Sequence, residues 1–281
     1  MLGYRGDAMS RLSEYAGARE LTLNLTLREL RSRYKKSILG WTWSLLNPLT
    51  TVLIYSVIFS FFLKVDPPKG DPSGLDVFPL FLLCGLLPWN FLSAGMTTSI
   101  QALIANSNLI KKVYFPREIL VVSTVLSLLI TFLVEMSVLL VALLLFGNMV
   151  IPWIPVVLLL MVIESFMVLG VGLMLSTLNV YFRDIQHLVN VAMTALFYSM
   201  PIVYPISFVA ERKETILGLH IIDIYRLNPL VRMVSAYRAA LYDLKFPALT
   251  DIGYFAVWAF GLCALGLFLF RKFERRLAEE L

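Results

Sequence analysis

The residues best placed to do chemistry inside a membrane are two acids, Glu135 and Glu164. Each lies in a long apolar segment, Glu135 twelve residues before Gly147 and Glu164 twelve residues after Pro152. At a helical rise of about 1.5 Å per residue, both carboxyl groups lie roughly 18 Å from the same turn. An ionisable group at that depth is costly. The pair therefore indicates either a proton relay or protonated, hydrogen-bonded acids that fix helix packing.

A second pattern places aromatic residues at seven-residue intervals along the first apolar segment. The series is Tyr34, Trp41, Tyr55 and Phe62, with Pro48 at the missing step and with Ser44 and Thr51 on the same side. A seven-residue repeat stays nearly on one side of a helix and drifts by about 20° per heptad. An aromatic face with small hydroxyls suits a sliding sugar chain, because rings stack on sugars without a fixed register. The alternative is helix packing or an aromatic belt at the lipid headgroups.

The sequence lacks the usual motifs of a catalytic or nucleotide-binding chain. It contains no Gly-Lys dipeptide and hence no P-loop, so any ATP and Mg²⁺ must be bound by another chain. Cys84 and Cys263 lie in apolar stretches, and His187 and His220 are isolated, which gives no metal-site spacing. We therefore expect a non-catalytic subunit with no metal or cofactor of its own.

Composition indicates a membrane protein. The 281 residues are 59% hydrophobic and 15% charged, whereas a soluble domain has about 45–50% apolar and about 25% charged residues. The net charge of +5 does not indicate a nucleic-acid partner, because the basic residues flank apolar segments, as membrane insertion requires.

The hydrophobic pattern predicts one all-α membrane domain over residues 1–281. Six spans are expected at 45–63, 77–96, 119–146, 151–178, 185–204 and 252–270. The third and fourth are joined by a four-residue turn from Gly147 to Val150, the second is interrupted at Gly85 and Pro88, and the fifth ends at Pro201 and Pro205. With both termini cytoplasmic, sixteen Lys and Arg lie inside and eight outside.

Residues 10–38 and 206–250 are expected to form helices outside the spans. In the first region Leu23, Leu27 and Leu30 have helical spacing, which favours an interfacial helix, although residues 21–27 also alternate as a strand would. In the second, Asn228-Pro229 is a helix start. It is followed by an apolar stripe of Leu230, Val231, Val234, Tyr237 and Leu241. These helices are expected to lie in the outer interface or to dip back into the protein.

The cytoplasmic segment 106–118 predicts a short helix, capped by Asn106 or Ser107 and stopped by Pro116. It offers four large apolar residues as anchors for a partner: Leu109, Ile110, Tyr114 and Phe115. The alternative is an ordinary positively charged loop with aromatic interface anchors.

Several segments together resemble the permease subunits of ABC-2 type polysaccharide exporters, which include O-antigen, teichoic acid and cell-wall glycan exporters. They are RYKKSILGWTWSLLNPL (33–49), NLIKKVYFPR (108–117), LNVYFRDI (178–185), PIVYP (201–205) and LNPLV (227–231). These segments occur in every quarter of the chain, so the resemblance covers nearly all of it.

The resemblance implies a homodimer in the bacterial inner membrane, with two copies of an ATP-binding subunit beneath it. The substrate would be a polysaccharide linked to polyprenyl pyrophosphate, and the aromatic face of the first span would line its conduit. The implied pyrophosphate entrance is Arg31, Arg33, Lys35 and Lys36. The implied ATPase contact is Asn108, Leu109, Ile110, Lys111, Lys112, Tyr114 and Phe115. The implied outer gate, from the helices of 206–250, includes Asn228, Pro229, Arg232 and Tyr237.

Two other functions remain open on the sequence alone. Glu135 and Glu164 would suit a proton-coupled secondary transporter. A membrane-embedded glycosyl or lipid transferase would need acidic or His groups at a membrane face, and the external acids form no recognisable cluster: Glu211, Glu214, Asp223, Asp243 and Asp251.

Overall fold

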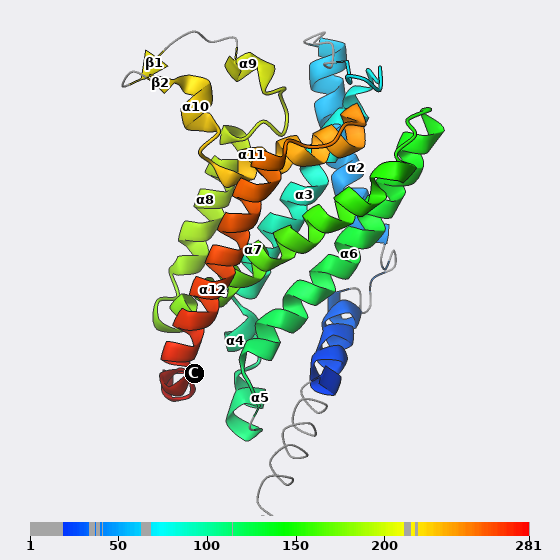
Figure 1. Ribbon diagram of the computed structural model, residues 1–281. Helices are drawn as coiled ribbons and strands as arrows, with labels where there is room; N and C mark the ends of the chain where they lie inside the picture. Colours follow the sequence, from blue (N-terminus) through cyan, green and yellow to red (C-terminus); the bar gives the residue numbers. More distant parts are fainter. Residues whose placement is uncertain are drawn as a thin grey trace, which may run out of the picture.

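Five long apolar helices form the body of the protein. The computed structural model describes residues 19–33, 37, 40, 42–62, 69–113, 115–210, 215–216 and 219–280. By length and composition, the helices able to cross a membrane are Thr42–Phe59, Phe78–Ser99, Glu118–Leu145, Ile151–Tyr181 and Leu249–Glu274. They belong to α2 (Thr42–Ser56) with the π-helical turn η1 (Val57–Phe62), α3 (Phe78–Ser99), α6 (Glu118–Leu145), η2 (Ile151–Trp153) with α7 (Ile154–Tyr181), and α12 (Leu249–Glu280). Figure 1 shows them side by side along one axis.

These helices match five of the six predicted spans, and the predicted hairpin is confirmed. Gly147 turns the chain between α6 and η2 with a positive φ of 84°, a conformation that glycine adopts without steric cost. The next residue, Asn148, donates from Nδ2 to the carbonyl of Leu241 at 2.9 Å. This hydrogen bond attaches the hairpin to the segment that precedes α12.

The fifth predicted span is shorter in the structure than the sequence pattern indicated. Helix α8 (Ile185–Ser199) has 15 residues, about 22 Å at the helical rise, against about 30 Å of hydrocarbon. Met200 is extended, and Pro201 follows it. The predicted break at Pro201 is therefore correct, but the helix before it is too short by itself to be counted with the other five.

Helix α3 is continuous through Pro88, so the predicted interruption of the second span is wrong. The helix covers 22 residues and contains Pro88 within it. Fifteen of its residues are buried, and α3 packs against α6, α7, α2 and α11. Because neighbouring helices enclose it on several sides, packing retains the helix although Pro88 cannot donate a backbone hydrogen bond.

The tightest helix contact joins α7 and α12. A Cβ added at Gly170 would lie 2.4 Å from the backbone nitrogen of Cys263, and one at Gly266 would lie 2.2 Å from the carbonyl oxygen of Gly170. Only glycine allows these two backbones to approach so closely. Small residues perform this role in many membrane helix pairs.

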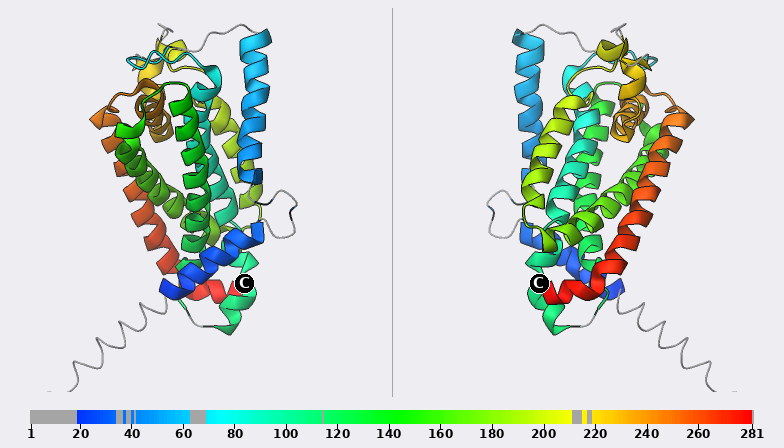
Figure 2. Two further views of the ribbon diagram at one scale, coloured as in Figure 1. Left: turned by 90° about the vertical axis from the view of Figure 1, so that its right-hand side faces the viewer. Right: turned by 90° about the vertical axis from the view of Figure 1, so that its left-hand side faces the viewer.

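Short elements cluster at the two ends of the bundle. At one end, the α11 end, lie α9 (Ser207–Ala210), β1 (Thr215–Ile216), β2 (Leu219–His220), α10 (Ile221–Tyr225), α11 (Pro229–Arg238) and the π-helical turn η3 (Ala239–Asp243). The two strands pair antiparallel, with Thr215 opposite His220. At the other end, the α5 end, lie a helix over residues 19–33, α4 (Ala102–Ala105), α5 (Ser107–Lys112) and the C-terminal part of α12 (Figures 1 and 2).

Residues 19–33 form a helix, as the helical spacing predicted, but its buried face differs from the prediction. Leu25, Thr26 and Leu30 are buried. Leu23 and Leu27, which were expected beside Leu30, are 52% and 46% exposed. The alternating leucines spread over two faces of the helix, and the protein covers only one of them.

Candidate functional site

A polar groove lies between α2, α3 and α6, within the membrane-spanning part of the molecule. Its volume is about 430 Å³. Seen from the side, α3 stands between α2 and α6, and the helix over residues 19–33 crosses their ends (Figure 2). The groove is lined by Arg33, Ser44, Asn47, Pro48, Thr51, Asn90, Phe91, Ser93, Ala94, Thr97, Leu128, Thr131, Phe132 and Glu135.

The groove is built from one stripe on each of three helices. In α3 the stripe runs from Asn90 through Ser93 to Thr97, and in α6 it ends with Thr131 and Glu135. These positions recur every three or four residues, which places them on one face of a helix. Hydropathy alone hides such a stripe, because its polar residues lie in segments that are apolar on average.

Several polar groups in the groove have no partner of their own. The side chains of Asn47 and Asn90 and the carboxyl group of Glu135 form no hydrogen bond within the described residues. Thr51 and Thr97 donate their hydroxyl protons to carbonyls one turn earlier, those of Asn47 at 3.1 Å and Ser93 at 2.8 Å. Their oxygen lone pairs therefore remain able to accept. A polar group without a partner in a membrane is costly, so this arrangement suits a ligand rich in hydroxyl groups.

The structure brings together only part of the predicted sugar-binding face. Ser44 and Thr51 lie in the groove. Tyr55 instead contacts the rings of Phe59 and Phe197, with centroids 6.2 and 6.4 Å away. Phe62 is 70% exposed. The predicted stripe thus does not form one continuous lining, and its members Tyr34 and Trp41 lie outside the described residues.

The predicted pyrophosphate entrance is divided in the same way. Arg33 lies at the groove, whereas Arg31 is exposed on the surface of its helix. Lys35 and Lys36 lie outside the described residues.

The two intramembrane acids have different surroundings. Glu164 is fully buried in α7 and accepts a hydrogen bond of 2.8 Å from the hydroxyl of Tyr237 in α11. Glu135 is partly exposed in the groove. No hydrogen bond joins the two acids, so Glu164 has the geometry of a packing residue and Glu135 that of a ligand-facing one.

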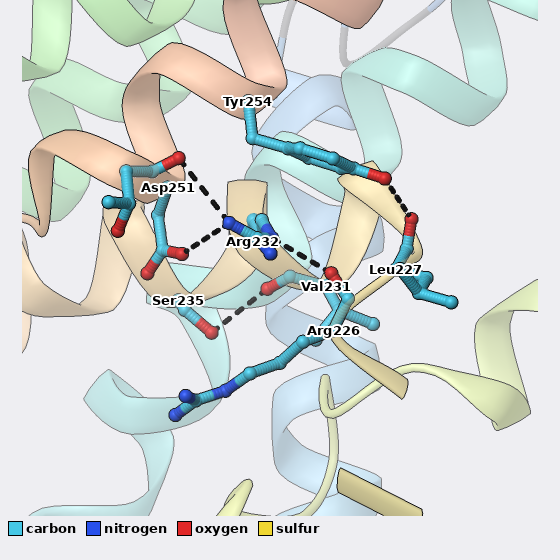
Figure 3. Close-up of polar contacts among 8 residues, drawn as sticks. Arg226, Leu227, Val231, Arg232, Ser235, Asp251 and Tyr254 are labelled. Atoms are coloured by element: carbon cyan, nitrogen blue, oxygen red, sulfur yellow. Dashed lines mark hydrogen bonds and ion pairs between the residues drawn. The ribbon is translucent and has the colours of Figure 1, made fainter. Parts of the chain in front are cut away.

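The predicted gate residues lie in or beside α11. Asn228 caps this helix by accepting from the backbone nitrogen of Leu230 at 2.9 Å, and Pro229 follows at the first position, as predicted. Arg232 donates to the carbonyl of Arg226 at 2.8 Å and pairs with Asp251 at 3.3 Å (Figure 3). The guanidinium of Arg232 also lies 4.1 Å from the ring centre of Tyr254.

Helix α11 dips into the protein. The whole predicted stripe is buried: Leu230, Val231, Val234, Tyr237 and Leu241. Of the two locations left open for this region, the interior is the one that α11 adopts.

Sequence reasoning missed Arg238, the last residue of α11. It is 8% exposed and lies 3.7 Å from the ring centre of Phe81. Its guanidinium donates to the carbonyls of Pro201 and Ile202, just beyond the end of α8. Burial lowers the pKa of Arg238 to about 10. This value is still well above neutral pH, so the guanidinium remains charged. Its one visible signal was a cation beside an apolar stripe.

The proposed ATPase anchors are partly used within the chain itself. Ile110 and Phe115 are 7% and 8% exposed, so the prediction that they lie on the free surface of this segment is wrong. Leu109 packs against the core, and Tyr114 lies outside the described residues. The surface of the segment is instead formed by Asn108, Lys111, Lys112 and Val113. The two large apolar residues turn inward because the short helix packs on the end of the bundle.

Long apolar helices around an internal polar groove define a multi-pass membrane protein with the features of a transporter. The ABC-2 type transporter family matches residues 20–242. The chain belongs to this family.

Individual relatives extend the match. The chain is 31% identical over 266 residues to the O-antigen export system permease protein RfbA of Klebsiella pneumoniae, covering 93% of this chain and 95% of the relative. It is 31% identical over 258 residues to the protein of the same name from Myxococcus xanthus, covering 88% and 91%. It is 26% identical over 259 residues to the polysialic acid transport protein KpsM of Escherichia coli, covering 89% and 92%.

Proposed function

We propose that this chain is the membrane subunit of an ATP-driven exporter that moves a polysaccharide, linked to polyprenyl pyrophosphate, out of the cytoplasm. The observation that carries the proposal is the groove between α2, α3 and α6, where Asn47, Asn90 and Glu135 present polar groups that have no partner among the described residues. The relatives are named for the export of O-antigen and the transport of polysialic acid, both of which are glycans.

The groove has the chemistry that a sugar requires. Amide groups both donate and accept, the threonine oxygens accept, and a carboxylate accepts from two hydroxyl groups. A volume of about 430 Å³ is within the range of small-molecule sites, which hold about 300–1,000 Å³. Each sugar unit would exchange hydrogen bonds with these side chains as the chain advances.

We infer that two copies of the chain work together. Helix α8 exposes Leu188, Val191 and Tyr198 by 64–70%, α2 exposes Leu53 by 65%, and η1 exposes Phe61 by 73%. Helix α8, the fifth of the six predicted spans, would serve as a span despite its short length when a second copy covers its exposed side. The bilayer accounts for exposed apolar residues alone, but polar Asn190 and Thr194 are also exposed on α8, which favours a protein neighbour or the conduit.

The α5 end is the proposed docking surface for two ATP-binding subunits, which would supply ATP and Mg²⁺. Arg28 donates to Asn106, the residue before α5, and Arg117 donates to the carbonyl of Glu274 near the end of α12. Gln101 donates to Gln186 at the start of α8. These hydrogen bonds therefore link residues 101–117, which include α4 and α5, to the helix over residues 19–33, to α12 and to α8. In this orientation both termini are cytoplasmic, and α9, α10 and α11 form the outer gate.

The proposal is tested in proteoliposomes that contain this chain and its ATP-binding partner. Asn90→Leu is expected to reduce export and to leave more lipid-linked glycan on the loading side of the membrane, because the groove loses a donor and an acceptor. Ser137→Leu is the matched control, since Ser137 is exposed on α6 outside the groove. ATP hydrolysis by this chain alone, or equal export by both variants, would contradict the proposal.

A proton-coupled transporter is the second candidate. The observation that favours it is the carboxyl group of Glu135, which forms no hydrogen bond in the part of the chain that the structure describes. Transport that continues without ATP but stops when the proton gradient collapses would support it. An ATP-driven exporter should instead keep most of its activity when Glu135 and Glu164 are both replaced by Gln.

A further inference from the structure

A second cavity, at the α11 end, collects positive charge. It has a volume of about 470 Å³ and lies among α11, η3, the start of α12 and residues 205–207. Its charged lining consists of Arg226, Arg232, Arg238, Lys245, Asp243 and Asp251. Figure 3 shows the polar contacts along one side of it.

The cations of this cavity exceed its anions, four to two. Arg232 pairs with Asp251 at 3.3 Å, and Lys245 pairs loosely with Asp243 at 3.7 Å. Burial raises the pKa of Asp243 above its usual range, although Lys245 lowers it, so this acid is the weaker counter-charge.

The two remaining arginines form no ion pair among the described residues. Arg238 donates to backbone carbonyls, which carry no charge. The side chain of Arg226 has no polar partner within the described residues and, in Figure 3, extends away from the pair formed by Arg232 and Asp251. Like charges that line one cavity repel one another. An anion in the cavity would remove that repulsion.

The cavity lies at an end of the molecule where so many cations are unusual. Lys and Arg concentrate on the cytoplasmic side of membrane proteins, yet this cluster lies at the end opposite α5. The cavity also includes Pro247 and Ala248, immediately before α12, a helix of 32 residues. The amino end of such a helix favours a negative group.

We propose that this cavity binds a phosphate group, either that of a lipid headgroup or that of a pyrophosphate. Guanidinium groups match phosphate oxygens in charge and in hydrogen-bond geometry. Phe81, Phe246 and Pro205 provide apolar surface for whatever the phosphate carries. The site is separate from the groove and does not depend on which glycan is exported.

The test uses the full chain, purified in a neutral detergent, with two probes: inorganic pyrophosphate and phosphatidylglycerol. Binding is measured directly by calorimetry for pyrophosphate and by native mass spectrometry for the lipid, with phosphatidylcholine as the lipid reference. The double variant Arg226→Gln/Lys245→Gln is expected to bind roughly tenfold more weakly, because it loses two charged contacts. Both residues are exposed, so the variant should retain its thermal stability.

Lys69→Gln is the matched control, because Lys69 is an exposed cation near the same end that does not line the cavity. It should bind both probes as the unmodified chain does. Weakening of pyrophosphate alone would identify a soluble or glycan-linked phosphate, and weakening of the lipid alone would identify a membrane headgroup. If neither probe binds, or if the double variant and the control bind equally, the proposal is overturned.

Discussion

The surroundings of Glu164 and Glu135 are opposite, although the sequence predicts similar depths for the two acids. Glu164 lies in a closed cluster with Tyr237, and Arg238 follows Tyr237 in the same helix. Glu135 lies in an open groove and has no hydrogen-bond partner among the described residues. Depth in a membrane makes an acid costly, but its neighbours decide whether that cost is met by packing or by a ligand.

Closed and open regions should respond differently to substitution. In the closed cluster, Tyr237 donates to Glu164 and Arg238 donates to backbone carbonyls, so a substitution that removes either donor should lower stability. In the groove, several polar groups form no hydrogen bond among the described residues and are available to a ligand. A substitution there should lower export and leave stability nearly unchanged.

Arg238→Leu should have the largest effect. It would remove the donors to the carbonyls of Pro201 and Ile202 and lower the free energy of unfolding by about 3–5 kcal/mol. Thermal or denaturant unfolding in detergent measures the change. Arg271→Leu, at an exposed position of α12, should change stability by less than about 0.5 kcal/mol. Equal losses for both variants would show that Arg238 does not hold α11 to the end of α8.

Tyr237→Phe should have the next largest effect on stability, because it leaves the buried carboxyl group of Glu164 without its hydrogen-bond donor. The expected loss in the free energy of unfolding is about 1–3 kcal/mol. Adding Glu164→Leu should recover part of it, since removing both polar partners leaves nothing unsatisfied. Glu164→Gln retains an acceptor and should cost less than Tyr237→Phe. The opposite order would mean that Glu164 acts through its charge, as the proton-relay interpretation requires.

Glu135→Leu should separate export from stability. We expect export to fall roughly tenfold through the loss of a charged hydrogen bond to substrate, with a change in stability below about 0.5 kcal/mol. Glu135→Gln should keep export within about twofold, because an amide also accepts from sugar hydroxyls. Glycan flux per ATP hydrolysed in proteoliposomes measures the export of both variants, and thermal unfolding in detergent measures their stability. A variant that loses stability but not export would place Glu135 with the packing residues.

Thr51→Val should have the smallest effect. It removes one neutral acceptor from the groove, so export should fall about two- to fivefold. Thr50→Val is the matched control, because Thr50 neighbours Thr51 in α2 and also donates to a carbonyl one turn earlier, but does not line the groove. Equal export by the two variants would remove Thr51 from the substrate path.

Local patterns predicted the elements well. Hydropathy predicted the five long helices and the buried stripe of α11. Turn and helix-start chemistry predicted the turn at Gly147 and the cap at Asn228. The prediction for α8 was too long, because residues after Met200 are apolar and continue the hydrophobic pattern without continuing the helix. Pro88 was read as an interruption because its neighbours, which enclose α3, come from distant parts of the chain.

The candidate site was predicted only in part. Ser44, Thr51, Arg33 and Glu135 were each singled out, but for three different reasons, and nothing in the sequence placed them in one groove. Asn47 and Asn90 were missed, since a single amide in an apolar segment carries little signal. The aromatic repeat was over-interpreted because a seven-residue spacing specifies one side of a helix and not what faces that side.

The sequence alone was enough to predict that this chain crosses a membrane, because its apolar segments are too long and too uncharged for a soluble core. It also determined the family, since short segments along the whole chain retain the same order. Only the tertiary structure decided which polar residues satisfy one another and which remain free to bind. That division depends on contacts between residues dozens of positions apart, such as Tyr237 and Glu164, which no local spacing encodes.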